Sequence, residues 1–310
     1  MKCIDGIKFV FRSRGLKKGL ARIWFILRRF GFTPFKQVKC LKYYIALLRK
    51  YQIRANFFIP AVIIKKYSKT IKGLNADSIE WGIHSDAHTD LSVLSENEQK
   101  QHVSNAIEIF DRLAIPFLGF RAPYLKINEK TLEVLAQEKR FLYDSSWTVL
   151  WEQIYDERRY SYSWAANFYK PKLSCLQKSK PFKVNSILEI PVSLPDDDIL
   201  VDRDKMDVQE VSRMWSQMLE ACVKRNELFV LQLHPERIFD VAEALEDLIK
   251  KAKTFDPPIW ITTLGDIAKW HKDEFDNNKP WPDPYEAALC ISGDIDTLTI
   301  FDFLDRLRTW

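Results

Sequence analysis

Acidic residues are missing from one long stretch of this chain. No Asp or Glu occurs between Asp5 and Asp77, while Lys and Arg recur throughout that stretch. The whole chain of 310 residues has a formal net charge of +5, so the remainder is correspondingly acidic. Such a basic block predicts a polyanionic partner: an anionic membrane surface, a phosphate-bearing substrate or nucleic acid. A basic surface that is merely solvated explains the pattern equally well.

Cysteine is scarce and dispersed. The five cysteines, none in a Cys-x-x-Cys pattern, are Cys3, Cys40, Cys175, Cys222 and Cys290. This odd set argues against a disulfide framework and favours reduced thiols in a cytosolic setting.

No apolar run reaches the roughly 20 residues of a membrane-spanning helix. The run from Ile7 to Phe11 is interrupted by Lys8, so no signal peptide is apparent. We therefore predict a cytoplasmic protein.

An amphipathic helical pattern lies within the basic region, at residues 16–30. Its apolar stripe consists of Leu16, Leu20, Ile23, Trp24 and Leu27, and Lys and Arg dominate elsewhere. The pattern predicts an interfacial helix on anionic lipid, with residues 8–30 as a peripheral anchor at the inner face of the membrane. A helix that packs on the core with a basic outer side fits equally well. We expect no nucleic-acid partner, and no protein partner is evident.

Helix and strand patterns alternate along the rest of the chain. Strands are expected at 55–59, 79–83, 117–120, 141–144, 187–190, 228–233, 259–262 and 287–291. Helices are expected at 36–51, 61–73, 95–113, 128–138, 207–225, 240–253 and 265–271. The aromatic stretch from 145 to about 184 is expected to be irregular. This alternation predicts βα units around a parallel sheet. Seven or eight strands favour a closed, irregular, TIM-like (β/α) barrel.

Only five histidines occur, and two of them stand four residues apart behind a predicted strand. Imidazoles at the spacing of His84 and His88 can share one divalent ion if a carboxylate arrives from elsewhere. The alternative is a pair of solvated or capping histidines in a polar loop. Other polar residues also follow predicted strands: Arg121, His234 and Asp294. Because the C-terminal ends of barrel strands share one face, this convergence favours the metal site.

Taken together, these segments resemble the polysaccharide deacetylase family of metal-dependent sugar N-deacetylases. His84-Ser-Asp-Ala-His88 is similar to the family's His-Ser/Thr-x-x-His metal motif, and Arg121-Ala-Pro123-Tyr124 to its Arg-x-Pro-Tyr motif. Glu189-Ile-Pro-Val-Ser with Asp196–Asp198 resembles the fourth motif, and Leu231-Gln-Leu-His234 the Leu-x-Leu-His motif. The resemblance covers residues 36–272 in the family's order.

One family motif is missing from its usual place. The family opens with a strand ending in Thr-Phe-Asp-Asp, ahead of the helix expected at 36–51, and here residues 30–35 contain no carboxylate. Ser-Gly-Asp294-Ile-Asp296 near the C-terminus resembles the family's Asp-x-Asp form instead. The simplest interpretation is a circular permutation, in which residues 285–310 supply the first strand and helix of a single barrel domain at 32–310. Residues 1–31 would be a basic extension. A surface loop or a truncated second domain is the alternative.

The resemblance implies a ligand set and a base. His84, His88 and Asp296 would hold a divalent ion, most simply Zn²⁺, with Co²⁺, Ni²⁺ or Fe²⁺ as alternatives. Asp294 would be the general base that takes a proton from the attacking water. The family's two aspartates are usually adjacent. The intervening residue here leaves open an exchange of the two roles.

The other motifs imply further roles. The backbone N–H of Tyr124 would complete an oxyanion hole, and His234 would protonate the leaving amine. Arg121 would pair with Asp294 and be oriented by Asp198. The candidate substrate-binding residues are Pro123, Trp147 and Asp198. Aromatic packing is the alternative for Trp147.

The implied activity is the removal of an N-acyl group, most simply acetyl, from an amino sugar. The basic N-terminal region suggests that the sugar carries phosphate, as in a lipid-linked or nucleotide-linked sugar. An inactive carbohydrate-binding or membrane-docked barrel is the alternative from another class. An O-deacetylase, or an amidase for a small non-sugar amide, is a third reading.

Overall fold

The computed structural model describes residues 29–74, 77–273 and 280–306. Its strands are β1 (Ala55–Ile59), β2 (Ile79–Ile83), β3 (Gly119–Phe120), β4 (Tyr143–Asp144), β5 (Thr148–Leu150), β6 (Lys172–Leu173), β7 (Phe182–Val184), β8 (Ile187–Glu189), β9 (Val192–Leu194), β10 (Leu228–Leu233), β11 (Ile259–Thr262) and β12 (Ala287–Asp294). Its helices are α3 (Phe35–Lys50), α4 (Ala61–Lys66), α5 (Ser68–Lys72), α6 (Glu96–Arg112), α7 (Glu129–Gln137), α8 (Tyr162–Tyr169), α9 (Val208–Lys224), α10 (Ile238–Ala252), α11 (Leu264–Asp273) and α12 (Ile300–Arg306).

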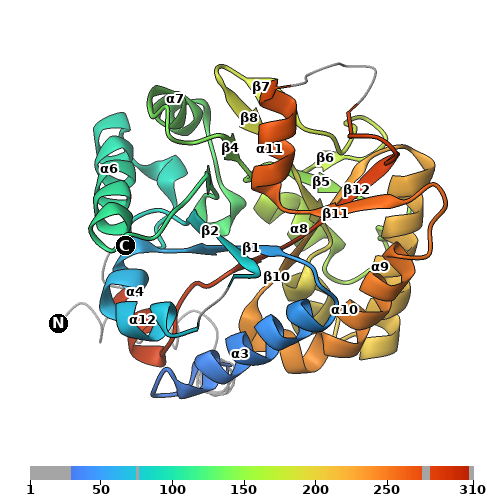
Figure 1. The fold of residues 1–310 in the computed structure, drawn as a ribbon, viewed down its shortest axis with the longest axis horizontal. Helices are drawn as coiled ribbons and strands as arrows, with labels where there is room; N and C mark the ends of the chain where they lie inside the picture. Colours follow the sequence, from blue (N-terminus) through green and yellow to red (C-terminus); the bar gives the residue numbers. More distant parts are fainter. Residues whose placement is uncertain (1–28, 75–76, 274–279, 307–310) are drawn as a thin grey trace.

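A mainly parallel sheet forms the centre of the molecule, with helices around it (Figure 1). Its strand order is β10-β12-β1-β2-β3-β4-β8-β7, with β11 paired to the first half of β12. Only β7 and β8 are antiparallel. A second sheet has the order β6-β5-β9. The expected α/β fold with parallel strands is therefore confirmed.

The last strand of the chain lies in the middle of the sheet. β12 pairs in parallel with β10 on one side, where Leu233 lies opposite Gly293, and with β1 on the other, where Phe58 lies opposite Asp294. All eight residues of β12 are buried. Because its two neighbours come from distant parts of the sequence, β12 joins the N-terminal and C-terminal halves into one sheet (Figure 1).

The two sheets approach each other between β9 and β10. The Val230 N–H of β10 donates to Ser193 Oγ of β9 at 3.2 Å. Within the described ranges, no backbone ladder joins β9 to β10. Among the described residues, hydrogen bonds between strands do not close the sheet into a barrel at this point.

The helices cover the sheet through amphipathic faces. α9 buries a stripe at helical spacing that consists of Val211, Met214, Trp215, Met218, Leu219 and Cys222. α9 packs on α10 and α10 on α3, while α4 packs on α6 and α6 on α7. α6 begins with the capping box expected from the sequence, in which Ser95 and Glu98 satisfy each other's backbone N–H groups.

The C-terminal helix docks beside the start of α3. The Ile300 N–H donates to the Gly31 carbonyl at 2.8 Å, and the Phe30 and Phe303 rings stack with centroids 5.5 Å apart. Lys66 and Tyr67 both contact the Asp302 carboxylate, which ties α12 to α4. The strand and helix predicted within residues 285–310 are therefore present as β12 and α12.

Two expectations about secondary structure were wrong. The helix expected at 61–73 is interrupted at Tyr67, which separates α4 from α5. The stretch from 145 to 184, expected to be irregular, contains α8 and the short strands β5, β6 and β7. Strands of two or three residues give no readable alternation, so periodicity cannot find them.

Other expectations lie partly outside the described ranges. Residues 16–28 of the amphipathic pattern are among them, so the membrane anchor stays a prediction. None of the described helices is long and apolar enough to span a bilayer.

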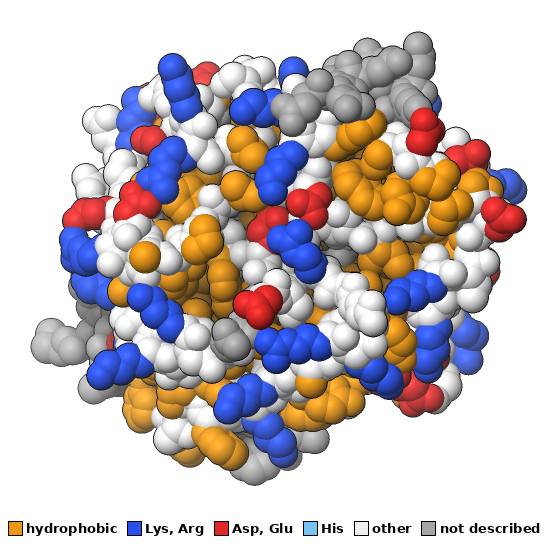
Figure 2. Space-filling model, in the orientation of Figure 1, with side chains coloured by type: hydrophobic (Ala, Val, Ile, Leu, Met, Phe, Trp, Pro, Cys, Tyr) orange, Lys and Arg blue, Asp and Glu red, His pale blue; other side chains and the backbone are white. Residues whose placement is uncertain are grey.

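The four described cysteines, Cys40, Cys175, Cys222 and Cys290, are free, as expected. On the face shown in Figure 2, Lys and Arg are scattered among hydrophobic and acidic side chains and form no continuous basic field.

Replacement of Gly293 by alanine should destabilise the sheet. An added Cβ would lie 2.4 Å from Phe57 Cε1 and 2.6 Å from the Leu233 carbonyl oxygen, so neighbouring strands would have to move apart. We expect Gly293→Ala to lower the free energy of unfolding by about 1–3 kcal/mol in chemical denaturation. Gly73→Ala, whose nearest contact would be Lys69 O at 3.1 Å, serves as the control and should cost less. Equal losses would contradict the close-packing argument.

Candidate active site

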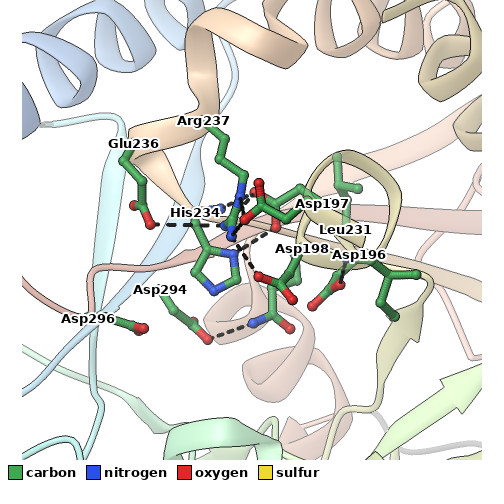
Figure 3. Close-up of polar contacts among 12 residues, drawn as sticks. Asp196, Asp197, Asp198, Leu231, His234, Glu236, Arg237, Asp294 and Asp296 are labelled. Carbon is green, nitrogen blue, oxygen red and sulfur yellow. Dashed lines mark hydrogen bonds and ion pairs between the residues drawn. The ribbon is translucent and has the colours of Figure 1, made fainter. Parts of the chain in front are cut away.

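Polar side chains from both halves of the chain meet at one edge of the sheet. His84 follows β2, Arg121 follows β3, and His234 follows β10. Asp294 ends β12, with Asp296 two residues further on. These strands are parallel neighbours, so their C-terminal ends lie together, and Figure 3 shows the His234 ring beside Asp294 with Asp296 close by. The convergence predicted from the sequence is present.

Three of these residues form a cluster suited to a metal ion. The ligand atoms of His84, His88 and Asp296 all lie within 4.8 Å of one another. Asp296 Oδ1 lies 3.1 Å from His88 Nε2 and 3.8 Å from His84 Nε2. His84 Nδ1 lies 2.7 Å from the carbonyl oxygen of Arg121, which can only accept, so Nδ1 carries the proton. His84 Nε2 is then a lone-pair donor, buried and without a hydrogen-bond partner among the described residues.

The protonation states of the cluster also suit a cation. Burial lowers the pKa of His84. Burial and the nearby charge of Arg306 lower the pKa of His88 to about 3. Burial alone would raise the pKa of Asp296, but His88 and Arg306 hold it well below its usual range. Neutral imidazoles and an ionised carboxylate are the forms that bind metal. The donor set therefore fits a divalent ion.

Asp294 is held beside this cluster by a buried arginine. Arg121 NH1 lies 3.1 Å from Asp294 Oδ1, and Gln232 Nε2 donates to Oδ2 at 2.7 Å. Arg121 has no exposed surface, and its other donors bind Ser145 and Ser292. The second carboxylate oxygen lies 4.0 Å from His84 Nε2. The ion pair expected between Arg121 and Asp294 is therefore formed, and it places the carboxylate next to the metal cluster.

His234 is paired with an aspartate that sequence reasoning did not single out. Asp197 accepts from the backbone N–H of His234 at 2.7 Å and lies 2.7 Å from Nδ1. Burial disfavours the charged ring, but the negative charge of Asp197 outweighs it and raises the pKa of His234 to about 10. Since this lies above the ordinary 6.5, the native-state stabilisation is full below about pH 6.5 and is lost as pH rises through about 10.

The turn after Arg121 has an unusual backbone conformation. Pro123–Leu125 form one short 3₁₀ turn, in which Tyr124 has the left-handed angles φ 61° and ψ 11°. Left-handed geometry in a non-glycine residue is strained and is common at functional sites. The Tyr124 ring packs edge-on against His88, with centroids 4.5 Å apart. Pro123 is buried beneath this turn.

A buried pair of carboxyl groups supports the same turn. The Ala122 N–H donates to Ser146 Oγ at 2.8 Å, and Ser146 Oγ donates to Asp144 at 2.8 Å. Glu189 accepts from the backbone N–H groups of Ser146 and Trp147. Burial raises the pKa of both Asp144 and Glu189, and the neighbouring Asp144 raises the pKa of Glu189 further. The hydrogen bonds from Ala122 to Ser146 and from Ser146 to Asp144 therefore hold the turn in place.

An arginine from the last helix also reaches the cluster. Arg306 NH1 lies 3.4 Å from Asp296 Oδ2, and NH2 contacts the His88 ring and the Tyr124 hydroxyl. Sequence reasoning missed Arg306, because only the docking of α12 brings it to this position. His88, His234, Asp294, Asp296 and Arg306 line a cavity of about 310 Å³.

Asp198 does not contact Arg121 as predicted, and Trp147 lies outside the catalytic cavity. Asp198 was expected to orient Arg121, but its partners are Arg237 at 2.7 Å and Arg203 at 3.1 Å. Ser145, Ser292 and Asp294 hold Arg121 instead. Trp147 lines a neighbouring cavity of about 690 Å³ and packs on Phe182. Of the three adjacent aspartates, Asp197 is the one that reaches a site residue, and side-chain direction in a turn cannot be read from three identical letters.

Comparisons with known proteins agree with this fold. Residues 35–139 match the family model of the polysaccharide deacetylases. The chain is 19% identical to a Mycobacterium smegmatis protein assigned to the polysaccharide deacetylases, over 84% of this chain and 82% of that one, with a TM-score of 0.59. A Pseudomonas aeruginosa PAO1 protein with the same assignment is 19% identical, over 77% of this chain and 74% of that one, with a TM-score of 0.59. PuuE allantoinase is 18% identical, over 81% of this chain and 74% of that one, with a TM-score of 0.58. No curated protein matches.

Residues 35–139 are therefore similar to the polysaccharide deacetylases, and the likeness to the solved structures shows a shared fold. The resemblance drawn from the sequence motifs is confirmed over this matched range. The matched range contains His84, His88 and Arg121. His234 and the two C-terminal aspartates lie outside it.

Replacement of Asp197 should change the proton affinity of His234. In Asp197→Asn the ring loses its negative partner, so its pKa should fall from about 10 towards the ordinary 6.5, as measured by NMR titration of the imidazole. Asp198→Asn is the matched control, because Asp198 contacts Arg237 but not the ring. If the pKa of His234 falls by a similar amount in both variants, the total negative charge nearby, rather than the direct contact with Asp197, sets this pKa.

Proposed function

We propose that this protein is a metal-dependent deacetylase that removes an N-acyl group, most simply acetyl, from an amino sugar. The observation that carries the proposal is the cluster of His84, His88 and Asp296, whose ligand atoms lie within 4.8 Å of one another. Asp294 and His234 line the same cavity, which supplies candidates for proton transfer. Two imidazoles and one carboxylate leave coordination positions free, as a hydrolytic metal site requires.

Zn²⁺ is the ion that we propose for this site, with Co²⁺, Ni²⁺ and Fe²⁺ as alternatives. A mixed nitrogen and oxygen donor set is usual for catalytic zinc. When bound, the ion would lower the pKa of a water molecule and polarise the amide carbonyl. It would also repel the Arg306 guanidinium, which contacts the same histidine and aspartate.

Asp294 is the proposed general base. Its carboxylate is fixed by Arg121 and Gln232 and lies 4.0 Å from the metal-facing nitrogen of His84, so it can take a proton from water held at the cluster. Asp296 lies closer to both histidines, which supports its role as the ligand and Asp294 as the base.

His234 would act on the leaving amine, and the turn at Tyr124 would act on the oxyanion. The raised pKa keeps the His234 ring protonated at neutral pH, and Asp197 occupies Nδ1, so Nε2 is the nitrogen that can protonate the leaving amine. The backbone N–H of Tyr124 would donate to the oxyanion. Asp144 and Glu189 would position this turn through Ser146.

The arrangement of β12 supports a circular permutation. β12 lies between β10 and β1, and α12 ends beside the segment that leads into α3. We propose that residues 285–310 take the place of the family's first strand and helix, and that residues 32–310 form one catalytic domain.

The proposed substrate carries phosphate, as in a lipid-linked or nucleotide-linked amino sugar. The support is the absence of acidic residues between Asp5 and Asp77. Binding of residues 8–30 to an anionic membrane from the cytoplasmic side remains part of this prediction.

Removal of one ligand should abolish metal binding. Purified wild-type protein should hold about one zinc ion per chain by elemental analysis, and Asp296→Ala and His88→Ala should lose it. Asp305→Ala is the control, because this exposed carboxylate lies in the same C-terminal segment but outside the cluster. Metal that persists in both Asp296→Ala and Asp294→Asn would remove the C-terminal segment from the site and favour an inactive barrel.

Replacement of the proposed base should separate binding from turnover. Asp294→Asn should keep its metal and lower kcat for amine release from N-acetyl amino sugars by about 10²–10⁴, the usual contribution of a general base. If Asp294→Asn loses metal while Asp296→Asn retains it, the two aspartates have exchanged roles.

A further inference from the structure

The strongest unexplained feature is the larger cavity beside the catalytic one. It measures about 690 Å³ and shares Leu125, Phe168 and Tyr169 with the catalytic cavity of about 310 Å³. A ligand seated at the metal cluster can therefore extend past these side chains without leaving the protein surface. Trp147, a predicted substrate-binding residue, lines only this larger cavity.

The charges of the two cavities differ. Among the described residues that line the catalytic cavity, three arginines are matched by three aspartates: Arg29, Arg203, Arg306, Asp198, Asp294 and Asp296. The charge on His234 is matched by Asp197 behind it. The described lining of the larger cavity has three lysines and one aspartate: Lys126, Lys170, Lys172 and Asp90. The excess positive charge thus lies in the larger cavity.

The lysines are not equivalent. Lys126 is already paired with Asp90 at 2.9 Å and lies over the Phe168 ring. Lys170 and Lys172 are exposed and stand two positions apart, just after α8. Lys170 has the left-handed angles φ 49° and ψ 48°, a conformation that glycine or asparagine adopts more easily. Lys172 is held by the pairing of β6 with β5, opposite Val149.

We infer that this cavity binds a negatively charged group, phosphate or carboxylate, that the amino-sugar substrate carries next to its N-acyl group. The inference rests on the proposed function, since it takes the N-acyl group to lie at the metal cluster. Lys170 and Lys172 supply the charge, with Lys126 behind them. The Trp147 and Tyr169 rings offer apolar faces for the sugar between the two ends.

Binding to metal-free protein tests this inference without requiring catalysis. Calorimetry would compare N-acetylglucosamine with its 1-phosphate and with N-acetylmuramic acid, which carries a carboxylate. We expect an anionic probe to bind about tenfold more tightly than the neutral sugar, the size expected for two partly exposed charge pairs. A preference for the phosphate alone indicates a glycosyl phosphate, and one shared with the carboxylate indicates an acidic saccharide more generally.

Matched variants locate the effect. The double variant Lys170→Gln/Lys172→Gln should lose the preference for the anionic probe and keep its affinity for the neutral sugar. Lys65→Gln/Lys69→Gln, which removes two exposed lysines from α4 and α5, should keep the preference. Equal affinity of wild-type protein for all three probes, or the same loss in both double variants, would overturn the inference.

The outcome is separable from that of the proposed function. A protein that prefers the anionic probe through Lys170 and Lys172 but releases no amine keeps the subsite and loses the deacetylase proposal. A protein that deacetylates neutral and phosphorylated sugars equally well keeps the deacetylase proposal and loses the subsite.

Discussion

The parallel pairing of β12 with β10 and β1 is the constraint on which the site depends. The pairing with β1 joins residues more than 200 positions apart, and it carries Asp294 and Asp296 to the edge where His84 and His88 lie. Without this strand, the two histidines would have no carboxylate within reach among the described residues. Close packing at Gly293 leaves little freedom in how β12 sits, so the carboxylates are positioned by the sheet rather than by a flexible loop.

Burial and the neighbouring charges then set the charge state of each polar residue in the site. The histidines of the cluster are kept neutral by burial, as metal ligands must be, while His234 is kept charged by Asp197. Arg121 is fully buried and is paired with Asp294. Two histidines beside one cavity thus differ in charge, because Asp197 raises the pKa of His234 while burial and the charge of Arg306 lower the pKa of His88.

Motif spacing predicted most of the site, and the residues it missed share a physical reason. His84, His88, Arg121, His234, Asp294 and Asp296 were identified because each follows a recognisable strand. Asp197 was passed over for Asp198 because the choice depends on the direction of side chains in an irregular turn. Arg306, Asp144 and Glu189 reach the site through helix docking and through hydrogen bonds between separate strands. None of these contacts has a fixed spacing along the chain.

The sequence by itself determined the class of fold, the position of most strands and the chemical types present at their ends. Apolar periodicity and the order of polar residues after strands are local properties, so they can be read without coordinates. The tertiary structure decided where the last strand sits and which aspartate pairs with His234. It also decided where uncompensated positive charge lies beside the catalytic cavity. Those outcomes depend on contacts between distant residues and on how burial changes the strength of charge interactions, and neither is encoded at any single position.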